Sequence, residues 1–233
     1  MPIPPLPSPA TIGFLHTSPL HPATFDGLLV ALTPSVHTVH VIDESLLAEA
    51  RHAGITPALE ARVIKALQDL ARQKPSLIVC TCSTIGPVAE AASAQLSCSV
   101  IRVDRPMAEA AIRMTRQAAG PVVVVAALAS TVGPTVALLE SVARADGTPM
   151  PDIRLIPCFE SWDAFERGNL ASYGQEIAQA IEPAAAGASA IVLAQASMMA
   201  ALPFLRHLRA PILTSPAALV AALGDALPAN PNG

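Results

Sequence analysis

Aromatic residues and charged residues are both scarce in this chain. Of its 233 residues, 3% are Phe, Tyr or Trp and 14% are charged, whereas 52% are hydrophobic. A core of ordinary size must therefore be built from Ala, Val, Leu and Ile. A chain this apolar is expected to fold into a globular α/β domain or into two smaller lobes, and not to be disordered.

A basic stripe is also missing. The 14 Lys and Arg residues are scattered, and the formal net charge is −4. Proteins that bind nucleic acid usually gather positive charge on one face. Nucleic acid is therefore not an expected partner.

Neither a secretory signal nor a membrane-spanning segment is expected. The opening "MPIPPLPSPA" has no basic region and no apolar run, so it is interpreted as a proline-stiffened tail. Residues 183–205 carry no charge, but Pro and Gly interrupt them, which favours a buried strand, a loop and a helix. No membrane partner is expected, and the protein is expected to be cytoplasmic.

The four cysteines show no zinc-ligand spacing, so no metal site is expected and the thiols are interpreted as reduced. They are Cys80, Cys82, Cys98 and Cys158.

Short β-branched runs alternate with longer Ala- and Leu-rich amphipathic runs. This alternation predicts buried parallel sheets covered by helices, whose ligands bind beyond the carboxyl ends of the strands. The expected strands are 11–16, 36–42, 76–80, 99–103, 122–127, 153–157, 190–194 and 211–213. The expected helices lie near 22–32, 45–53, 57–73, 87–95, 106–118, 133–145, 160–181, 198–207 and 216–225.

A repeat divides the chain into two lobes. Thr17 and Thr131 both follow a strand and are 114 positions apart, and the same offset separates Cys82 from Ala196. The expected organisation is a flexible tail (1–10), a first lobe (11–119), a second lobe (120–210), a last strand and helix on the first lobe (211–225) and a tail (226–233).

The turn "IVCTCSTIGP" (78–87) combines an apolar strand with two thiols and three hydroxyls. Cys82 lies beyond the strand and shortly before Pro87, a favoured first residue of a helix. Unpaired N–H groups at a helix start favour a thiolate, or a bound carboxylate. Thr81, Ser83 and Thr84 add hydroxyl donors, and Gly86 is expected to let the backbone approach a ligand.

The other thiols are interpreted as buried core residues, because cysteine packs as a small hydrophobe. Cys80 is expected to end the strand in the core. A Cys-x-Cys metal or redox pair is disfavoured, because no further ligands accompany it.

The segments "VCTCSTIGP", "HVIDESLL" (40–47), "IRVDRPMAEAA" (101–111) and "VVAALASTVGPT" (124–135) resemble the aspartate/glutamate/hydantoin racemase superfamily, which includes maleate isomerase and arylmalonate decarboxylase. The resemblance covers roughly residues 11–215. It implies an α/β fold of two Rossmann-like lobes with parallel sheets, related by pseudo-twofold symmetry, with a cleft between them. It also implies chemistry without a cofactor, in which thiols act at the carbon next to a carboxylate.

The resemblance assigns the first catalytic thiol to Cys82. Racemases of this group use a second thiol from the other lobe, and the matching position here is Ala196. Two-thiol racemisation is therefore in doubt. A non-thiol group could serve as the second acid or base, and His16, Ser197 and Glu160 are the candidates.

Three reactions of a small carboxylic acid remain open. Cys82 could serve a racemase- or isomerase-like reaction, with or without covalent attack, or it could protonate one face after decarboxylation of a malonate-type acid. Each reaction needs neutral donors around the developing enediolate. The candidates for binding substrate are Thr17, Ser18, Thr81, Ser83, Thr84, Ser130, Thr131, Gln195, Ala196 and Ser197.

Two other classes remain as alternatives. A cysteine hydrolase needs a base beside Cys82, and no Cys-His-Asp signature is apparent in the sequence. A binding protein that has lost catalysis would explain the missing second thiol. Whether the chain forms a homo-oligomer stays open.

Other polar and aromatic features are interpreted as structural. Asp43 is expected to cap a helix. Trp162, Phe165 and Tyr173 are expected to pack in the core.

Overall fold

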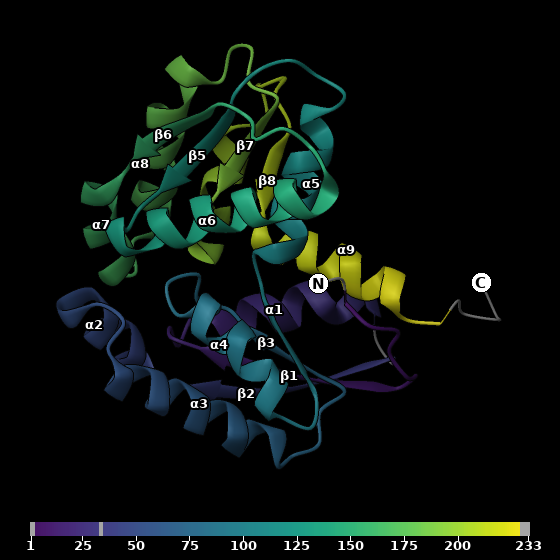
Figure 1. Cartoon of the computed structure of the whole chain (residues 1–233). Helices are drawn as coiled ribbons and strands as arrows, with labels where there is room; N and C mark the ends of the chain where they lie inside the picture. The colour runs from purple at the N-terminus through teal and green to yellow at the C-terminus, as the bar shows by residue number, and fades with distance from the viewer. Residues whose placement is uncertain (1–2, 33–34, 229–233) are drawn as a thin grey trace. The chain divides into compact units, whose positions relative to one another are not determined.

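The strands form two separate parallel sheets of four strands each in the computed structural model (Figure 1), which describes residues 3–32 and 35–228. The chain divides into two compact units. Unit 1 runs to Val103 and resumes at Leu219, and unit 2 comprises Asp104–Ala218. Each unit therefore combines one parallel sheet with its own helices, as the sequence predicts.

The sheet of unit 1 has the strand order β2-β1-β3-β4. Its strands are β1 (Ala10–His16), β2 (Val36–Ile42), β3 (Leu77–Cys80) and β4 (Ser99–Arg102). Its helices are α1 (His21–Leu29), α2 (Glu44–Ala53), α3 (Pro57–Ala71) and α4 (Gly86–Ala92).

The sheet of unit 2 repeats this topology with the order β6-β5-β7-β8. Its strands are β5 (Val122–Ala126), β6 (Ile153–Pro157), β7 (Ala190–Leu193) and β8 (Ile212–Thr214). Its helices are α5 (Arg105–Thr115), α6 (Ala129–Asp146), α7 (Trp162–Glu166), α8 (Leu170–Ile181) and a 3-10 helix, Ala196–Phe204. Helix α9 (Ser215–Ala226) begins in unit 2 and ends in unit 1. The shared topology confirms the two-lobe repeat.

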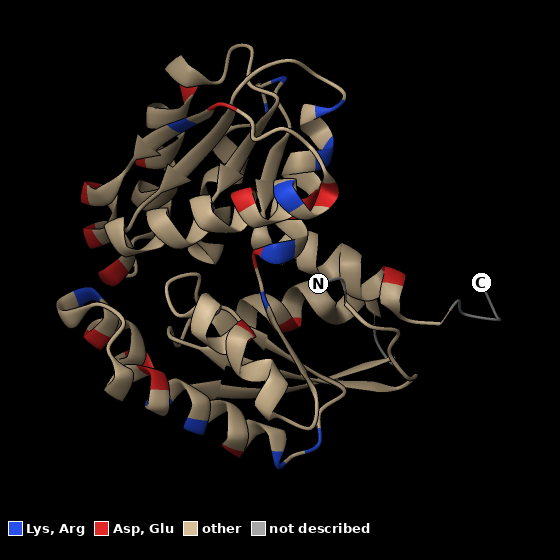
Figure 2. Cartoon of the chain, in the orientation of Figure 1, with Lys and Arg blue, Asp and Glu red and all other residues tan. Residues whose placement is uncertain are grey.

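The strands β1, β3, β5 and β7 inside the sheets are almost wholly buried because both faces of each sheet are covered, whereas the edge strands β2 and β6 are partly exposed. Only β4 and β6 carry a Lys, Arg, Asp or Glu residue, and Figure 2 shows most of the coloured segments on helices and loops. In unit 1, one face of the sheet packs on α2, α3 and α4 in a core that includes Leu15, Ile78 and Leu67. Phe14 and His16 point to the other face, where their rings contact Phe25 of α1.

Helix starts follow local capping rules. Asp43 caps α2 by accepting a hydrogen bond from Ser45 N–H at 3.0 Å, which confirms its structural role. Thr56 caps α3 by accepting from Leu59 N–H at 3.2 Å, and Pro57 follows at the first helical position. The aromatic residues Trp162, Phe165 and Tyr173 contact one another in the core of unit 2, as expected.

Domain boundaries differ from the sequence expectation. Unit 2 begins at Asp104 and not at 120, because α5 packs on α6, β7 and β8. Strand β8 pairs with β7, so it belongs to unit 2 and not to the first lobe. The expected tail at 1–10 is anchored where it is described: Leu6 is buried, and its N–H donates to Ala226 O at 2.9 Å. Residues 1–2 and 229–233 of the two expected tails lie outside the described residues.

Three helices also differ from expectation. The segment 160–181 is broken at Arg167–Asn169, where Gly168 has a positive φ of 74°. The segment 198–207 forms the 3-10 helix Ala196–Phe204 and not an α-helix. Helix α6 starts at Ala129 and not at 133, so Gly133 and Pro134 lie within it. Among the described residues, no helix combines the length and the apolar character needed to cross a membrane.

Candidate functional site

The thiol turn and the turn after β1 lie at the same edge of the sheet of unit 1. Leu15 pairs with Cys80 in register, and Thr81 N–H donates to Leu15 O at 3.0 Å. The segment Thr17–Ser18 follows β1, and the segment Thr81–Thr84 follows β3. Parallel strands therefore bring these two sets of predicted site residues together, at the carboxyl edge where ligands bind in such sheets.

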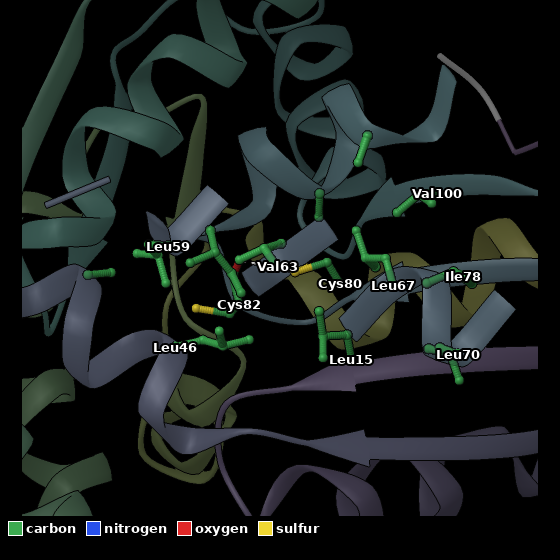
Figure 3. Close-up of a cluster of buried hydrophobic side chains, with 14 residues drawn as sticks. Leu15, Leu46, Leu59, Val63, Leu67, Leu70, Ile78, Cys80, Cys82 and Val100 are labelled. Carbon is green, nitrogen blue, oxygen red and sulfur yellow. Dashed lines mark hydrogen bonds between the residues drawn. The ribbon is translucent and has the colours of Figure 1, made fainter. Parts of the chain in front are cut away.

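Cys82 is buried in apolar surroundings. Its exposed fraction is 7%, and it belongs to the core cluster formed with α2 and α3. Figure 3 shows Cys82 between Leu46 of α2 and Leu59 of α3, with Cys80 deeper along the strand. No hydrogen bond to the Cys82 thiol is found within residues 3–32 and 35–228. The Cys82 thiol therefore has no hydrogen-bond partner among the described residues and lies in apolar surroundings. Cys80 is a core residue, as predicted.

The hydroxyls of unit 1 have different partners. Thr17 is 5% exposed and makes no side-chain hydrogen bond within the described part of the chain. Ser18 Oγ accepts from Leu20 N–H at 3.3 Å and so holds its own turn. Ser83 and Thr84 are buried and already interact with other groups of the chain. Thr17 is thus the hydroxyl most available to a ligand.

His16 is fully buried and uses both ring nitrogens. Its Nδ1 lies 2.8 Å from Thr81 Oγ1, and its Nε2 lies 2.8 Å from Nδ1 of His40. Burial, together with the neighbouring His21 and His40, lowers the pKa of His16 to about 3. His16 is therefore neutral at pH 7 and has no nitrogen left for a substrate.

Gly86 has a different role from the one expected. A Cβ at this position would lie 3.0 Å from Nε of Arg102, so the missing side chain makes room for a buried arginine. Arg102 ends β4 and pairs in register with Cys80. A cation beside the thiol turn is not predictable from sequence, because Arg102 lies on a different strand.

In unit 2, Gln195 occupies the place that Cys82 occupies in unit 1. Ala194 N–H donates to Val125 O at 2.9 Å, as Thr81 N–H donates to Leu15 O. Gln195 follows Ala194 as Cys82 follows Thr81, an offset of 113 positions. The sequence offset of 114 instead matched Cys82 to Ala196, which is buried one residue further on. Neither residue is a thiol.

Only one of the two polar atoms of the Gln195 side-chain amide has a hydrogen-bond partner among the described residues. Its Oε1 accepts from Ala127 N–H at 3.0 Å, and its Nε2 is buried without a hydrogen-bond partner in the described chain. A buried donor without a partner is costly, so this amide nitrogen is a candidate to bind a ligand. Its place at the carboxyl edge of β7 suits a carboxylate oxygen.

The other predicted residues of unit 2 are helical or engaged. Ser130 and Thr131 lie in the first turn of α6, and both already interact with other groups. Ser197 is hydrogen-bonded to the hydroxyl of Tyr173 at 2.9 Å. Burial raises the pKa of the nearby Cys158 thiol to about 11. Glu160 lies in a 3-10 turn after β6 and is exposed.

Sequence reasoning gave little weight to His21. It opens α1, and its Nδ1 lies 3.4 Å from Thr81 Oγ1. Burial lowers its pKa to about 4, and its Nε2 has no hydrogen-bond partner among the described residues. The sequence feature that could have indicated a role for His21 is its position five residues after His16, in the first turn beyond β1.

One hollow of unit 2 lies at the amino edge of its sheet, opposite the edge that carries the predicted site residues. A cavity of about 620 Å³ in unit 2 is lined by Ser189 and Pro211, which precede β7 and β8. Within the described ranges, no group of three or more His, Cys, Asp or Glu residues is arranged to hold a metal ion. The candidate site is therefore the carboxyl edge of each sheet.

Comparisons with known proteins agree with this fold. The family model Asp/Glu/Hydantoin racemase matches residues 29–223. No curated protein matches the chain.

Solved structures share the fold at low identity. Aspartate racemase from Picrophilus torridus has a TM-score of 0.66 at 14% identity, over 93% of this chain and 94% of that one. Glutamate racemase from Bacillus anthracis has a TM-score of 0.68 at 19% identity, over 93% and 80%. A glycine-to-cysteine mutant of arylmalonate decarboxylase has a TM-score of 0.57 at 17% identity, over 93% of both chains.

Proposed function

Because the chain belongs to the Asp/Glu/Hydantoin racemase family, we propose that it is a cofactor-independent enzyme that acts at the carbon next to a carboxylate of a small acid. Cys82 is the thiol that exchanges a proton with that carbon. The observation that carries the proposal is the unpaired Cys82 thiol, 7% exposed, at the carboxyl edge of β3. The proposed reaction is racemisation or isomerisation.

The surroundings of Cys82 suit this chemistry. The apolar walls from α2 and α3 exclude water, which strengthens every electrostatic interaction with a charged intermediate. Thr17 Oγ1 is a free neutral donor in the neighbouring turn. One preorganised donor to an enediolate is worth about 10²–10³ in rate. In unit 2, Gln195 Nε2 is a donor without a partner among the described residues at the corresponding edge of the second sheet.

Decarboxylation of a malonate-type acid is the second candidate. The observation in its favour is that Gln195 and Ala196 stand where a second thiol is expected. In that reaction the bond to the departing carboxylate breaks, CO₂ leaves, and Cys82 protonates the enediolate on one face. A single thiol is sufficient for this sequence of steps.

The deciding experiment is incubation of the whole chain in D₂O with amino acids, hydantoins, malonates and maleate, followed by ¹H NMR. Racemisation gives deuterium at the carbon next to the carboxylate with change of configuration, and isomerisation of maleate gives its trans isomer. Decarboxylation gives a shorter acid with one deuterium. We expect Cys82→Ala to lower turnover by about 10²–10⁴-fold, the usual worth of an acid–base group.

The matched control is Cys98→Ala, which removes a half-buried thiol that follows α4 in the sequence. It should keep wild-type turnover. Full turnover by Cys82→Ala on a substrate of the panel would rule out the proposed role of this thiol.

A further inference from the structure

A chain of hydrogen bonds connects the surface of unit 1 with the residue next to Cys82. Asp26 Oδ1, on a side chain that is 52% exposed, lies 3.0 Å from Nε2 of His40. His40 Nδ1 lies 2.8 Å from Nε2 of His16, and His16 Nδ1 lies 2.8 Å from Thr81 Oγ1. Thr81 Oγ1 in turn lies 3.4 Å from Nδ1 of His21. The chain joins β1, β2, α1 and the thiol turn.

The carboxylate at one end gives this chain a direction. A carboxylate only accepts, so His40 donates from Nε2 and accepts at Nδ1. His16 must then donate from Nε2 to His40 and accept at Nδ1 from the Thr81 hydroxyl. The oxygen of Thr81 accepts from Nδ1–H of His21. The proton of His21 is thereby held on Nδ1, and Nε2 is left with a lone pair.

Burial keeps the imidazole rings of His16 and His21 neutral, with one proton on each ring. It lowers the pKa of His16 to about 3 and that of His21 to about 4, so both imidazoles are neutral at pH 7. The groups around them are aromatic or are members of the same chain: Phe14, Phe25 and His40. Leu15 O is the alternative acceptor for the Thr81 hydroxyl, but it lies farther away, at 3.2 Å, and also receives the backbone N–H of Thr81. The hydroxyl proton is therefore assigned to the closer Nδ1 of His16, at 2.8 Å.

Thr81 and Cys82 point to opposite faces of the sheet. Thr81 contacts His16 and His21 on the α1 side, whereas Cys82 packs between Leu46 and Leu59 on the other side (Figure 3). This is the alternation that β-structure imposes on neighbouring residues. A carbon held beyond the end of β3 would thus have a thiol toward one face and an imidazole toward the other.

We propose that His21, and not His16, is the second acid–base residue of the reaction, and that Asp26, His40, His16 and Thr81 are positioning residues that keep Nε2 of His21 unprotonated. The inference rests on the proposed function of Cys82. Nε2 removes the α-proton as the C–H bond breaks, and the Cys82 thiol delivers its proton to the opposite face of the enediolate. The products are an imidazolium at His21 and a thiolate at Cys82, and the reverse reaction uses the same two groups with the roles exchanged.

A substrate carboxylate supplies the charge that this step needs. An anion beside an imidazole favours its protonated form, so the pKa of His21 rises when substrate occupies the site.

The first test reads the tautomers directly. Long-range ¹H–¹⁵N correlation spectra of the whole chain at pH 7.5, assigned with single His→Gln variants, should show His21 protonated at Nδ1 and His16 at Nε2. In Asp26→Asn the tautomers of His40 and His21 should become mixtures. A wild-type His21 protonated at Nε2 overturns the inference, whatever the substrate panel gives.

The second test uses a substrate identified by the panel in D₂O. His21→Gln should lower turnover by about 10²-fold or more, while the exchange of deuterium through Cys82 continues on one enantiomer. Asp26→Asn should lower kcat by about 5–20-fold with KM unchanged, because Asp26 affects His21 only through the series of hydrogen bonds. His52→Gln, at the exposed end of α2, is the matched control and should have wild-type turnover.

Two variants distinguish a failure of the His21 inference from a failure of the proposed function. If Cys82→Ala loses turnover but His21→Gln keeps it, the inference about His21 is wrong and the proposed function stands. If Cys82→Ala also keeps full turnover, the proposed function itself is wrong.

Discussion

The proposed chemistry is assigned to single residues at the carboxyl edges of the two sheets. In unit 1 these are Thr17, His21 and Cys82, whose Oγ1, Nε2 and Sγ lack partners within the described residues. His16 and Thr81, which the sequence also nominates, are occupied with each other. Side-chain atoms without a hydrogen-bond partner are available to bind substrate, whereas hydrogen-bonded side chains keep them in position.

Gln195 allows a residue-scale prediction. In Gln195→Glu, one carboxylate oxygen still accepts from Ala127 N–H, but an oxygen replaces the unpaired Nε2 donor. We expect KM for a carboxylate substrate to rise at least about 10-fold, because a charge-assisted hydrogen bond is lost and like charges meet. Steady-state kinetics and isothermal titration with the substrate measure this. Unchanged affinity would show that Nε2 does not bind the carboxylate.

Packing between elements decides which glycines can change. Gly174 of α8 faces the 3-10 helix Ala196–Phe204, and a Cβ there would lie 2.1 Å from Ala200 O. Gly133 of α6 has nothing within 4 Å of its would-be Cβ. The two glycines lie in helices, but only Gly174 is required by the fold.

Gly174→Ala should therefore destabilise the protein by about 1–3 kcal/mol, because backbone must move to make room. Gly133→Ala, the control at an open helical position, should stabilise it by about 0.5–1 kcal/mol through helix propensity. Urea unfolding followed by circular dichroism compares the two variants. Equal effects would contradict the close approach of α8 to the 3-10 helix.

Helix capping and strand limits operate at this same scale and are set by local sequence. The strand 36–42 and the strand 153–157 have the predicted limits, since β-branched residues recur within each and turn residues bound it. The segment 160–181 was predicted as one helix. It breaks at Gly168, which takes a positive φ where the chain leaves α7 for α8.

At the scale of the whole molecule, the buried histidines make stability depend on pH. The pKa values of His16 and His21 in the folded chain are about 3 and about 4, below the ordinary 6.5 of an unfolded chain. Below pH 6.5 the unfolded chain binds protons that the folded chain does not. Stability is thus complete above pH 6.5 and is lost as the pH falls through 6.5 toward 4 and 3.

By pH 5, the loss should reach at most about 2 kcal/mol per histidine, since one pKa unit corresponds to about 1.4 kcal/mol. His21→Gln should remove about half of this dependence. Urea titrations of wild type and variant at pH 8, 6.5 and 5 measure it. An unfolding free energy that stays flat between pH 8 and pH 5 would show that these rings are not buried as neutral groups.

The sequence by itself determined the class of the fold, the two-lobe repeat and the thiol turn. Strand and helix periodicities are local, so the limits of most elements could be read directly, and "IVCTCSTIGP" marked the turn after β3. The resemblance to racemases, confirmed by the family match over residues 29–223, rests on the same short segments.

Only the tertiary structure decided which side chains are free. Hydrogen bonds such as His16–His40, Thr81–His21 and Gln195–Ala127 join residues that lie far apart in the chain. A local sequence pattern therefore does not predict them. The unit boundary at Val103 and the match of Gln195 to Cys82 likewise depend on helix packing and strand register. These features follow from pairing and burial at long range, which are set when the sheets form and not by any single segment.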